Sequence, residues 1–494
     1  NTTGAANVAV GSQALDANTT GAGNVAIGYN AGSAITTANN NIAIGNGALD
    51  VTTTGATNVA IGDSALGANT TASNNVAVGS QALVANTTGT GNTAVGSISM
   101  EANTTGNDNA AFGRNTLGAN TTGANNVAVG LGALDANTTA DENTGVGRSA
   151  LAANTTGYYN TAVGKDALAA NTTASSNTAV GRDVLTANTT GTGNTAAGKE
   201  ALATNTTASY NTAIGHEALK LNTTGTSNVA IGADALDANT TASNNTAIGT
   251  GSLGANTTGT RNSGVGASAM GLNTTGDYNT AMGYDALGAN TTADNNTAFG
   301  YTALAANTTG ARNNGFGSLS LNSTTTGNYN VGVGYGALYT ATTPNSNTAV
   351  GDTAMYATTT GAENTSVGSG SMRYNTTGAS NVAVGSGALN ANITGAGNVA
   401  IGALALDTST AISNTIAIGK GSLTANTTGV SNTAVGHEAL GANTSGGENV
   451  AMGYGVLDAN TTASNNTGVG YLALSANTTG AGNTAVGTFT LDAN

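Results

Sequence analysis

The 494-residue chain has no cysteine and no tryptophan, a single proline, and few aromatic (4%) or charged (7%) residues. Because cysteine is absent, a disulfide framework is excluded. The 10 basic residues form no patch and the net charge is −14, which argues against binding to nucleic acid. No run of about 20 apolar residues is present, so the sequence predicts no membrane-spanning helix. It also contains no recognisable signal peptide.

What the chain does contain is a repeat of 17 residues. One copy, 160–176, reads Asn-Thr-Ala-Val-Gly-Lys-Asp-Ala-Leu-Ala-Ala-Asn-Thr-Thr-Ala-Ser-Ser. Its central glycine recurs from Gly11 to Gly487 in 28 steps of 17, without insertion or deletion. Length alone would suggest about three domains, but an unbroken repeat predicts one continuous stacked array over residues 1–494. The Ala/Asn/Thr/Gly-rich composition is otherwise typical of disorder, and the periodic return of apolar residues argues against it.

The residues before the central glycine predict a short β-strand of about four residues. In Thr161-Ala162-Val163 and its equivalents, a β-branched residue, a small residue and a larger apolar residue alternate. A second short strand is expected over Ala-Leu-x-Ala, as at 167–170. Glycine and the Asn-Thr-Thr turn recur too often in each repeat to allow a helix of about 10 residues. We therefore predict an all-β parallel β-solenoid of about 29 stacked coils, about 140 Å long at a strand spacing of roughly 4.8 Å.

Two asparagines recur in each coil. The strand asparagine directly precedes the expected strand, and the turn asparagine begins Asn-Thr-Thr. Asparagine suits turns, and stacked copies can form amide ladders between parallel strands. The turn asparagine is replaced in six coils, so its turn is less strictly specified. The predicted structural ladder comprises the strand asparagines and central glycines, exemplified by Asn7, Asn24, Asn58, Asn160, Asn483, Gly11, Gly28 and Gly164.

The small middle residue of the strand, Ala162 in the example, is nearly always Ala or Gly. If its two neighbours point into the coil, it points outward. A column of Ala and Gly on a free surface is unusual, so we expect another chain to pack there, most simply in a symmetric homo-oligomer. The alternative is a very thin coil in which this residue faces inward. A single coil buries too little apolar surface to order 17 residues, so stacking and a partner chain are needed.

The sequence offers little for catalysis or metal binding. The two histidines, His216 and His437, are followed by Glu217 and Glu438, and they share a repeat position 13 coils apart. At the strand spacing this is roughly 60 Å, so they cannot meet within one chain. We expect solvated turn residues, with a ring of three histidines from three chains as the remote alternative. The prediction is no enzyme, no cofactor and no metal.

Charged residues are few and lie in turn positions. Lys165, Arg182 and Lys199 precede acidic residues in three successive coils, which predicts a small surface cluster of little energetic value. Acidic residues of adjacent coils could pair around Ca²⁺, but nothing resembles the Gly/Asp-rich calcium-binding nonapeptide repeat. We favour a role in solubility.

The Asn-Thr-Thr turn also matches the N-glycosylation pattern, although asparagine suits the turn for structural reasons alone. Threonine columns raise an ice-binding hypothesis, but two consecutive threonines should not lie on one flat face. Tyrosines that follow the central glycine should cover neighbouring backbone rather than grip sugar rings. The candidate glycosylation positions are Asn18, Asn69, Asn86, Asn154 and Asn171.

The segments Asn-Val-Ala-Val-Gly (7–11), Asn-Val-Ala-Ile-Gly (24–28) and Asn-Ile-Ala-Ile-Gly (41–45) are each followed, after two residues, by a small residue. They resemble the head repeats of trimeric autotransporter adhesins, roughly Ser-Val-Ala-Ile-Gly-x-x-Ser/Ala. The longer form at 279–292 and 466–479 is similar to repeat arrays of phage tail fibres and bacterial surface proteins that end in a self-cleaving chaperone domain. The resemblance implies a left-handed β-roll, with three rolls packed into a trimer.

The resemblance has limits. The period of 17 exceeds the usual 14 to 16 of the adhesin heads, and the sequence has no neck, stalk, anchor or chaperone domain. We expect a segment of a longer protein with its export signal, anchor and caps elsewhere. The expected function is a stiff extracellular fibre or adhesin shaft on a cell or virion surface, as a trimer or an end-to-end filament. The alternative is recognition of host glycans, or less favourably ice, through the repetitive face.

Overall fold

The computed structural model describes residues 2–492. The chain divides into two compact units, unit 1 (Asn1–Asn245) and unit 2 (Thr246–Asn494). Within the described residues every regular element is a three-residue strand, and no helix is long and apolar enough to cross a bilayer.

Unit 1 contains the following strands: β1 (Val8–Val10), β2 (Val25–Ile27), β3 (Ile42–Ile44), β4 (Val59–Ile61), β5 (Val76–Val78), β6 (Thr93–Val95), β7 (Ala110–Phe112), β8 (Val127–Val129), β9 (Thr144–Val146), β10 (Thr161–Val163), β11 (Thr178–Val180), β12 (Thr195–Ala197), β13 (Thr212–Ile214) and β14 (Val229–Ile231).

Unit 2 contains the following strands: β15 (Thr246–Ile248), β16 (Ser263–Val265), β17 (Thr280–Met282), β18 (Thr297–Phe299), β19 (Asn314–Phe316), β20 (Val331–Val333), β21 (Thr348–Val350), β22 (Thr365–Val367), β23 (Val382–Val384), β24 (Val399–Ile401), β25 (Ile416–Ile418), β26 (Thr433–Val435), β27 (Val450–Met452), β28 (Thr467–Val469) and β29 (Thr484–Val486).

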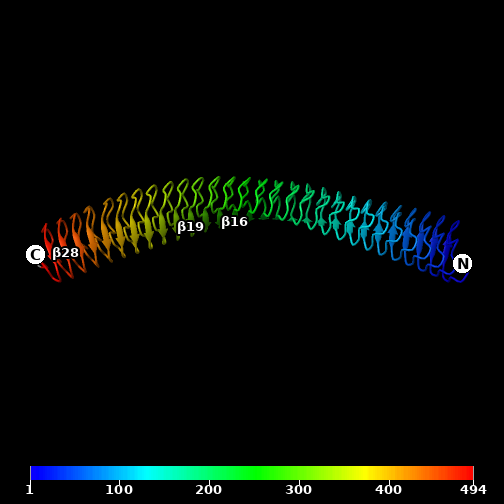
Figure 1. Cartoon of the computed structure of the whole chain (residues 1–494), viewed down its shortest axis with the longest axis horizontal. Coiled ribbons are helices and arrows are strands. Elements are labelled where there is room, and N and C mark those ends of the chain that lie inside the picture. Colours follow the sequence, from blue (N-terminus) through cyan, green and yellow to red (C-terminus); the bar gives the residue numbers. More distant parts are fainter. Residues whose placement is uncertain (1, 493–494) are drawn as a thin grey trace. The chain divides into compact units, whose positions relative to one another are not determined.

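In each unit, successive strands pair in parallel and in register, so identical repeat positions stack in columns (Figure 1). Between β10 and β11, for example, Ala162 lies beside Ala179 and Val163 beside Val180. The side of the coil without strands is also held by backbone hydrogen bonds, since Leu168 N–H donates to the Val184 carbonyl at 3.0 Å. This arrangement confirms the predicted parallel β-solenoid with 17-residue coils.

The expected second strand is wrong. Residues 167–170 form a turn, and Leu168 has a left-handed backbone conformation with φ 52°. Left-handed backbone costs a bulky residue about 1–2 kcal/mol. Complete burial of the leucine side chain offsets this, because it contributes about 1.5–3 kcal/mol. The bend turns the chain back and closes the coil.

The orientation expected for the middle strand residue is also wrong. Ala162 and Ala179 are 0% exposed, whereas Val163 and Val180 on the same strands are 37% and 43% exposed. The interior is therefore thin, and alanine, leucine and the two asparagines fill it. The middle strand position holds no side chain larger than that of Ser366, which is also buried, so the thin-coil alternative is the one observed.

The strand asparagines form a buried ladder. Asn160 Oδ1 accepts the backbone N–H of Asn177 at 3.0 Å, and Asn160 Nδ2 donates to the Ala174 carbonyl at 2.9 Å. The same bonds recur at Asn24 and Asn58, and at the ends Asn7 Oδ1 and the Asn483 N–H take part. Each amide thus satisfies backbone groups that face the dry interior.

The central glycines allow the coils to stack closely. Gly164 has φ +139°, and a Cβ at this residue would collide with the backbone carbonyl of Gly181 in the next coil. Gly11 and Gly28 have a similar backbone conformation, and a Cβ at either residue would likewise collide with the carbonyl of the equivalent glycine in the next coil. Only glycine combines this backbone conformation with such an approach.

Candidate functional site

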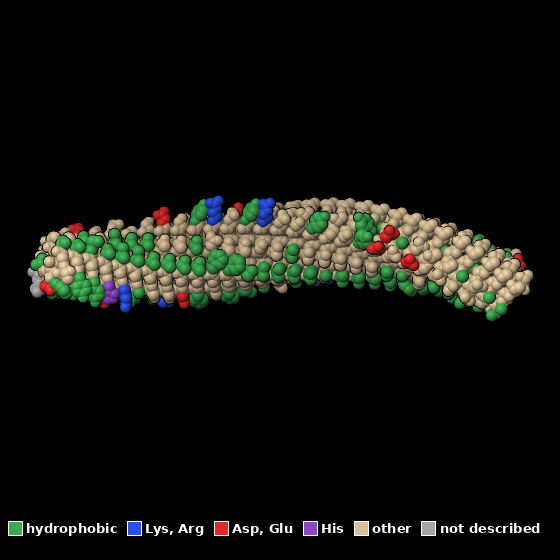
Figure 2. All heavy atoms as spheres, turned by 60° about the horizontal axis from the view of Figure 1, so that its bottom comes forward, with side chains coloured by type: hydrophobic (Ala, Val, Ile, Leu, Met, Phe, Trp, Pro, Cys, Tyr) green, Lys and Arg blue, Asp and Glu red, His purple; other side chains and the backbone are tan. Residues whose placement is uncertain are grey.

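The largest unusual surface is the outer face of the strands. We call it the strand face, meaning the first and last residues of each strand in unit 1 and in unit 2. The last residues of the strands, such as Val163, Val180 and Ile214, are about two-fifths exposed. Figure 2, which turns the strand side forward, shows hydrophobic side chains gathered in continuous rows along the stacking direction. Each row results from the in-register pairing, which places equivalent residues one coil apart.

The strand face is about as large as the largest apolar patch of a typical monomeric protein. At a strand spacing of roughly 4.8 Å, the face runs for about 60–70 Å in each unit. Its two rows stand two residues apart on a strand, which is about 7 Å, so each unit presents a strip of roughly 450 Å². Contiguous apolar patches of this order are often functional on monomers. The strand face is therefore the principal candidate for an interaction surface.

Threonine fills one row of the strand face over part of unit 1. In strands β9 to β13 the first residue is threonine in every coil, so hydroxyl and methyl groups stand beside the aliphatic row. The sequence hypothesis placed ice binding on the consecutive threonines of Asn-Thr-Thr. The structure instead brings a threonine row and an aliphatic row onto one sheet face, because residues two apart on a strand share a side.

Several exposed aromatic rings stack on one another along the coils. The ring of Tyr454 lies between those of His437 and Tyr471, with centroids 5.4 and 5.3 Å away. Tyr284 and Tyr301 stack likewise at 5.7 Å. Both faces of Tyr454 are thus covered by neighbouring coils and cannot stack on a sugar ring.

The predicted charge cluster is present in unit 1. Lys165 Nζ lies 2.8 Å from Asp166, and Lys199 and Lys220 lie 2.9 and 2.8 Å from Glu200. Hydrogen bonds from Lys220 and then Lys199 lower the pKa of Glu200 to about 2. These side chains stand in solvent at the surface, where such pairs contribute little to stability.

His216 lies beside two carboxylates in unit 1. Its Nε2 is 3.6 Å from Glu217 Oε1, and its Nδ1 is 3.8 Å from Asp234 Oδ1 in the next coil. One ligand atom from each of the three residues lies within 4.8 Å of the other two. Burial, followed by the negative charges of Asp234 and Glu217, raises the pKa of nearby Asp237. An imidazole and two carboxylates are a donor set that divalent transition metals accept.

His437, at the equivalent position in unit 2, has a different neighbourhood. Its Nδ1 lies 3.6 Å from Glu438 Oε2 and has no hydrogen-bond partner. The next coil offers Tyr454 and Gly455, so no third ligand stands where Asp234 stands in unit 1. Sequence reasoning recognised the shared position of the two histidines but missed this difference, which lies one coil further on.

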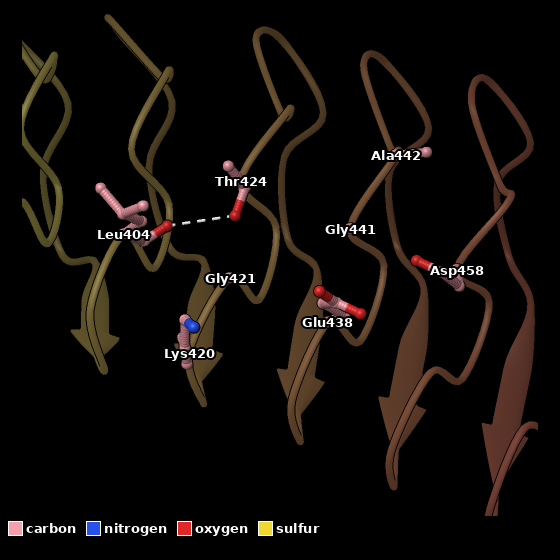
Figure 3. A pocket seen from close by; sticks show the side chains of 8 residues that line it. All are labelled: Leu404, Lys420, Gly421, Thr424, Glu438, Gly441, Ala442 and Asp458. Carbon is pink, nitrogen blue, oxygen red and sulfur yellow. Dashed lines mark hydrogen bonds between the residues drawn. The ribbon is translucent and has the colours of Figure 1, made fainter.

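A shallow hollow of about 540 Å³ lies beside Glu438. Figure 3 shows its lining on successive coils, with Lys420, Glu438 and Asp458 around glycine-rich backbone. Thr424 Oγ1 donates to the Leu404 carbonyl at 3.2 Å across one end. Burial and the charge of Glu438 raise the pKa of Asp458, against a smaller opposing effect of His437. The hollow exists because Gly421 and Gly441 provide no side chain.

The turn asparagines considered for glycosylation point inward. Asn171 Nδ2, for example, donates to Asn154 Oδ1 and to the Ala174 carbonyl, both at 2.9 Å. An N-linked glycan would have to replace one of these amide hydrogens inside the coil. The folded coils therefore present none of these amides to a glycosylating enzyme, and the geometry supports a structural role. The five positions, at most 2% exposed, are Asn18, Asn69, Asn86, Asn154 and Asn171.

The sequence analysis missed the strand face, although a signal for it was present. The last strand residue varies from Ala197 to Phe316, whereas the middle residue never exceeds the size of Ser366. An interior has a fixed volume and tolerates little variation. The variable column is therefore the outer one.

Comparison of the chain with known proteins gives no family assignment, since no family model and no curated protein matches it.

Proposed function

We propose that the chain is a structural shaft segment of an extracellular fibre or adhesin, and that its strand face is covered by further copies of the same chain. The observation that carries this proposal is the pair of in-register rows on the strand face, in which apolar side chains such as Val163, Val180 and Ile214 are about two-fifths exposed. A trimer is the arrangement that the resemblance to adhesin heads implies. The proposed location is a cell surface or a virion tail.

The uniform repeat supports a shaft more than a tip. Receptor-binding sites commonly occupy loops that depart from the scaffold. Here all 28 repeat steps keep the same length, so no inserted loop projects from either unit. The clusters described above are small and solvated, and they offer no arrangement of nucleophile, base and oxyanion donors.

Energetics favours association over many coils at once. Covering the exposed two-fifths of a valine or isoleucine contributes roughly 0.5–1 kcal/mol. Over the 14 strands of unit 1 this amounts to at most about 10 kcal/mol, which is comparable with the about 4–15 kcal/mol that association costs. A few coils would therefore not hold copies together, and association needs the contacts of a whole unit or of both units.

The test is the mass of the full chain in solution, measured by light scattering at several concentrations. We expect a stable multiple of the single-chain mass of 47.1 kDa, and three chains if the resemblance holds. The triple variant Val163→Lys, Val180→Lys, Ile214→Lys should shift this mass to a single chain, because burying an unpaired ammonium is costly.

A matched control places the same charges elsewhere on the same coils. Thr173, Thr190 and Thr224 are exposed second threonines of Asn-Thr-Thr. Their replacement by lysine should leave the oligomer intact. A wild-type chain that remains a monomer at every concentration would contradict association through the strand face, and mass that rises without limit would favour filaments.

A second candidate function is ice binding by a single, unassociated chain. The observation that favours it is the threonine row of β9 to β13 beside an aliphatic row, since a flat, regular array on a β-solenoid can match an ice lattice. Association would cover this array, so the two proposals exclude each other. A monomer that inhibits ice recrystallisation, and loses this activity in Thr161→Lys, Thr178→Lys, would support it.

A further inference from the structure

We propose that His216, Glu217 and Asp234 form a binding site for one divalent transition-metal ion of the Zn²⁺ type, which links two adjacent coils of unit 1. The site is independent of the proposed shaft function. It uses side chains of the turn that follows the central glycine, away from the strand face.

The backbone places the three residues together. His216 and Glu217 follow Gly215 directly, and Asp234 occupies the position of Glu217 one coil later. The Asp234 N–H donates to the His216 carbonyl at 3.0 Å. Glu217 and Asp234 share a left-handed backbone conformation, with φ 57° and 56°, so their side chains leave the coil in the same way. The spacing of the two carboxylates is therefore set by the stacking of the coils.

The donor atoms are close enough to share an ion. His216 Nε2 lies 3.6 Å from Glu217 Oε1, and one donor from each of the three residues lies within 4.8 Å of the others. Donors of a Zn²⁺ ion stand about 2.0–2.2 Å from the metal, so small rotations of these partly exposed side chains bring them into range. Because the set contains an imidazole, it favours zinc-like ions over Ca²⁺ or Mg²⁺, which prefer oxygen ligands only.

The local charge also favours a cation. Around His216 the acidic residues are Glu200, Glu217, Asp234 and Asp237. The cations of the same coils are Lys199 and Lys220. Glu200 forms ion pairs with Lys199 at 2.9 Å and with Lys220 at 2.8 Å. Lys220 also forms an ion pair with Glu217 at 3.1 Å. Asp234 Oδ1 lies 3.8 Å from His216 Nδ1, and no lysine or arginine pairs with Asp234 within the described residues. A bound dication would balance the remaining negative charge.

Unit 2 contains an incomplete version of the same arrangement. His437 Nδ1 lies 3.6 Å from Glu438 Oε2, and His216 Nε2 lies 3.6 Å from Glu217 Oε1. Asp458 repeats the position of Asp237, but Gly455 replaces Asp234. The His437 pair is therefore an internal control that lacks one ligand.

The test uses the full, untagged chain after treatment with a chelator. Titration with ZnCl₂ by calorimetry should show one tight equivalent per chain, and Co²⁺ should give the visible absorption of a low-coordinate site. We expect His216→Asn and Asp234→Asn each to weaken Zn²⁺ affinity at least about tenfold. His437→Asn should leave the affinity and the stoichiometry unchanged.

A gain-of-site variant tests the geometry directly. Gly455 has φ +60°, close to the φ 56° of Asp234, so aspartate fits the backbone there. A Cβ at Gly455 would meet the end of the Leu472 side chain, so Gly455→Asp is combined with Leu472→Ala. We expect this variant to bind two equivalents of Zn²⁺.

Three results would overturn the proposal: a wild-type chain that binds no Zn²⁺ more tightly than His216→Asn does, equal losses in His216→Asn and His437→Asn, or a folded Gly455→Asp, Leu472→Ala variant that still binds one equivalent. Circular dichroism of each variant shows whether the coils remain folded.

Discussion

The inner and outer sides of a single strand follow opposite rules. On β11 the middle residue Ala179 is completely buried, while its neighbour Val180 is 43% exposed. The larger apolar residue faces out, and the smaller one faces in. In most folded domains the reverse holds, since burial favours the larger apolar side chain.

The difference shows that interior volume, rather than hydrophobicity, decides which residues are buried in this coil. Two amide ladders and the leucine column already occupy the interior, so the middle strand position holds no side chain larger than that of Ser366. The displaced aliphatic residues become the strand face. The predictions below test the two sides, from the largest expected effect to the smallest.

The largest effect should follow from a change in the stacking backbone. Gly164→Ala places a Cβ against the carbonyl of Gly181 in a backbone conformation that alanine avoids. We expect a loss of about 3 kcal/mol or more in the free energy of unfolding, measured by denaturant titration. The control is Gly132→Ala, where φ is +67° and nothing lies within 4 Å of the added Cβ. This change should cost no more than about 1–2 kcal/mol, and equal losses would contradict the stacking argument.

Overfilling the interior should come next. Ala179→Leu adds three carbons where no free volume remains, and we expect about 1–3 kcal/mol of destabilisation, or more. Val180→Leu on the outer side should cost less than Ala179→Leu, because the coil does not enclose the Val180 side chain. Thermal unfolding of the two variants compares the faces directly. If Val180→Leu were the more damaging change, the assignment of inner and outer sides would be wrong.

The two amide ladders should differ in their tolerance. Asn177→Ala removes the acceptor of the Asn194 N–H and the donor to the Gly191 carbonyl, both at 2.9 Å. Leaving these buried groups unpaired should cost about 1–3 kcal/mol.

Asn171→Thr, in the turn ladder, should cost less. The chain itself carries threonine at Thr52, whose Oγ1 donates to the Asn69 carbonyl at 2.8 Å. Hydrogen exchange of the Asn194 backbone amide and of the Asn188 side-chain amide, which donates to Asn171 Oδ1, would locate the opened ladder in each variant. Similar losses from both changes would show that the ladders contribute equally.

The smallest effect concerns the exposed charges. Lys220 and Lys199 lower the pKa of Glu200 from 4.5 to about 2. A carboxyl group with a lowered folded-state pKa contributes stability above its unfolded pKa, and this contribution disappears as the pH falls from about 4.5 to 2. The melting temperature of wild type should therefore fall slightly more than that of Glu200→Gln across this range. Added salt should reduce the difference, and parallel pH profiles would contradict it.

Much of the fold follows from the 17-residue sequence repeat. The constant spacing of the central glycines requires identical coils, and the asparagine before each strand predicts a ladder because parallel, in-register coils place equal residues together. The charge cluster at Lys165, Arg182 and Lys199 followed from the same reasoning. Contacts between equivalent residues of neighbouring coils could therefore be predicted without a structure.

Features that depend on neighbouring columns could not be placed. The turn at Leu168 was mistaken for a strand, because nothing in Ala-Leu-x-Ala indicates a leucine with a left-handed backbone conformation. Complete burial of the leucine side chain offsets the cost of that conformation. The cluster at His216 depends on Asp234 in the next coil, and on how far the coil spacing lets their side chains converge.

The sequence by itself determined the period, the parallel stacking and the identity of each column, because all three follow from exact repetition. Only the tertiary structure decided which columns face inward. Alternation along a strand tells which residues share a side, but the choice of the inner side depends on the volume enclosed when the coil closes. That volume admits Ala162 and excludes Val163, and so leaves the aliphatic rows on the outside.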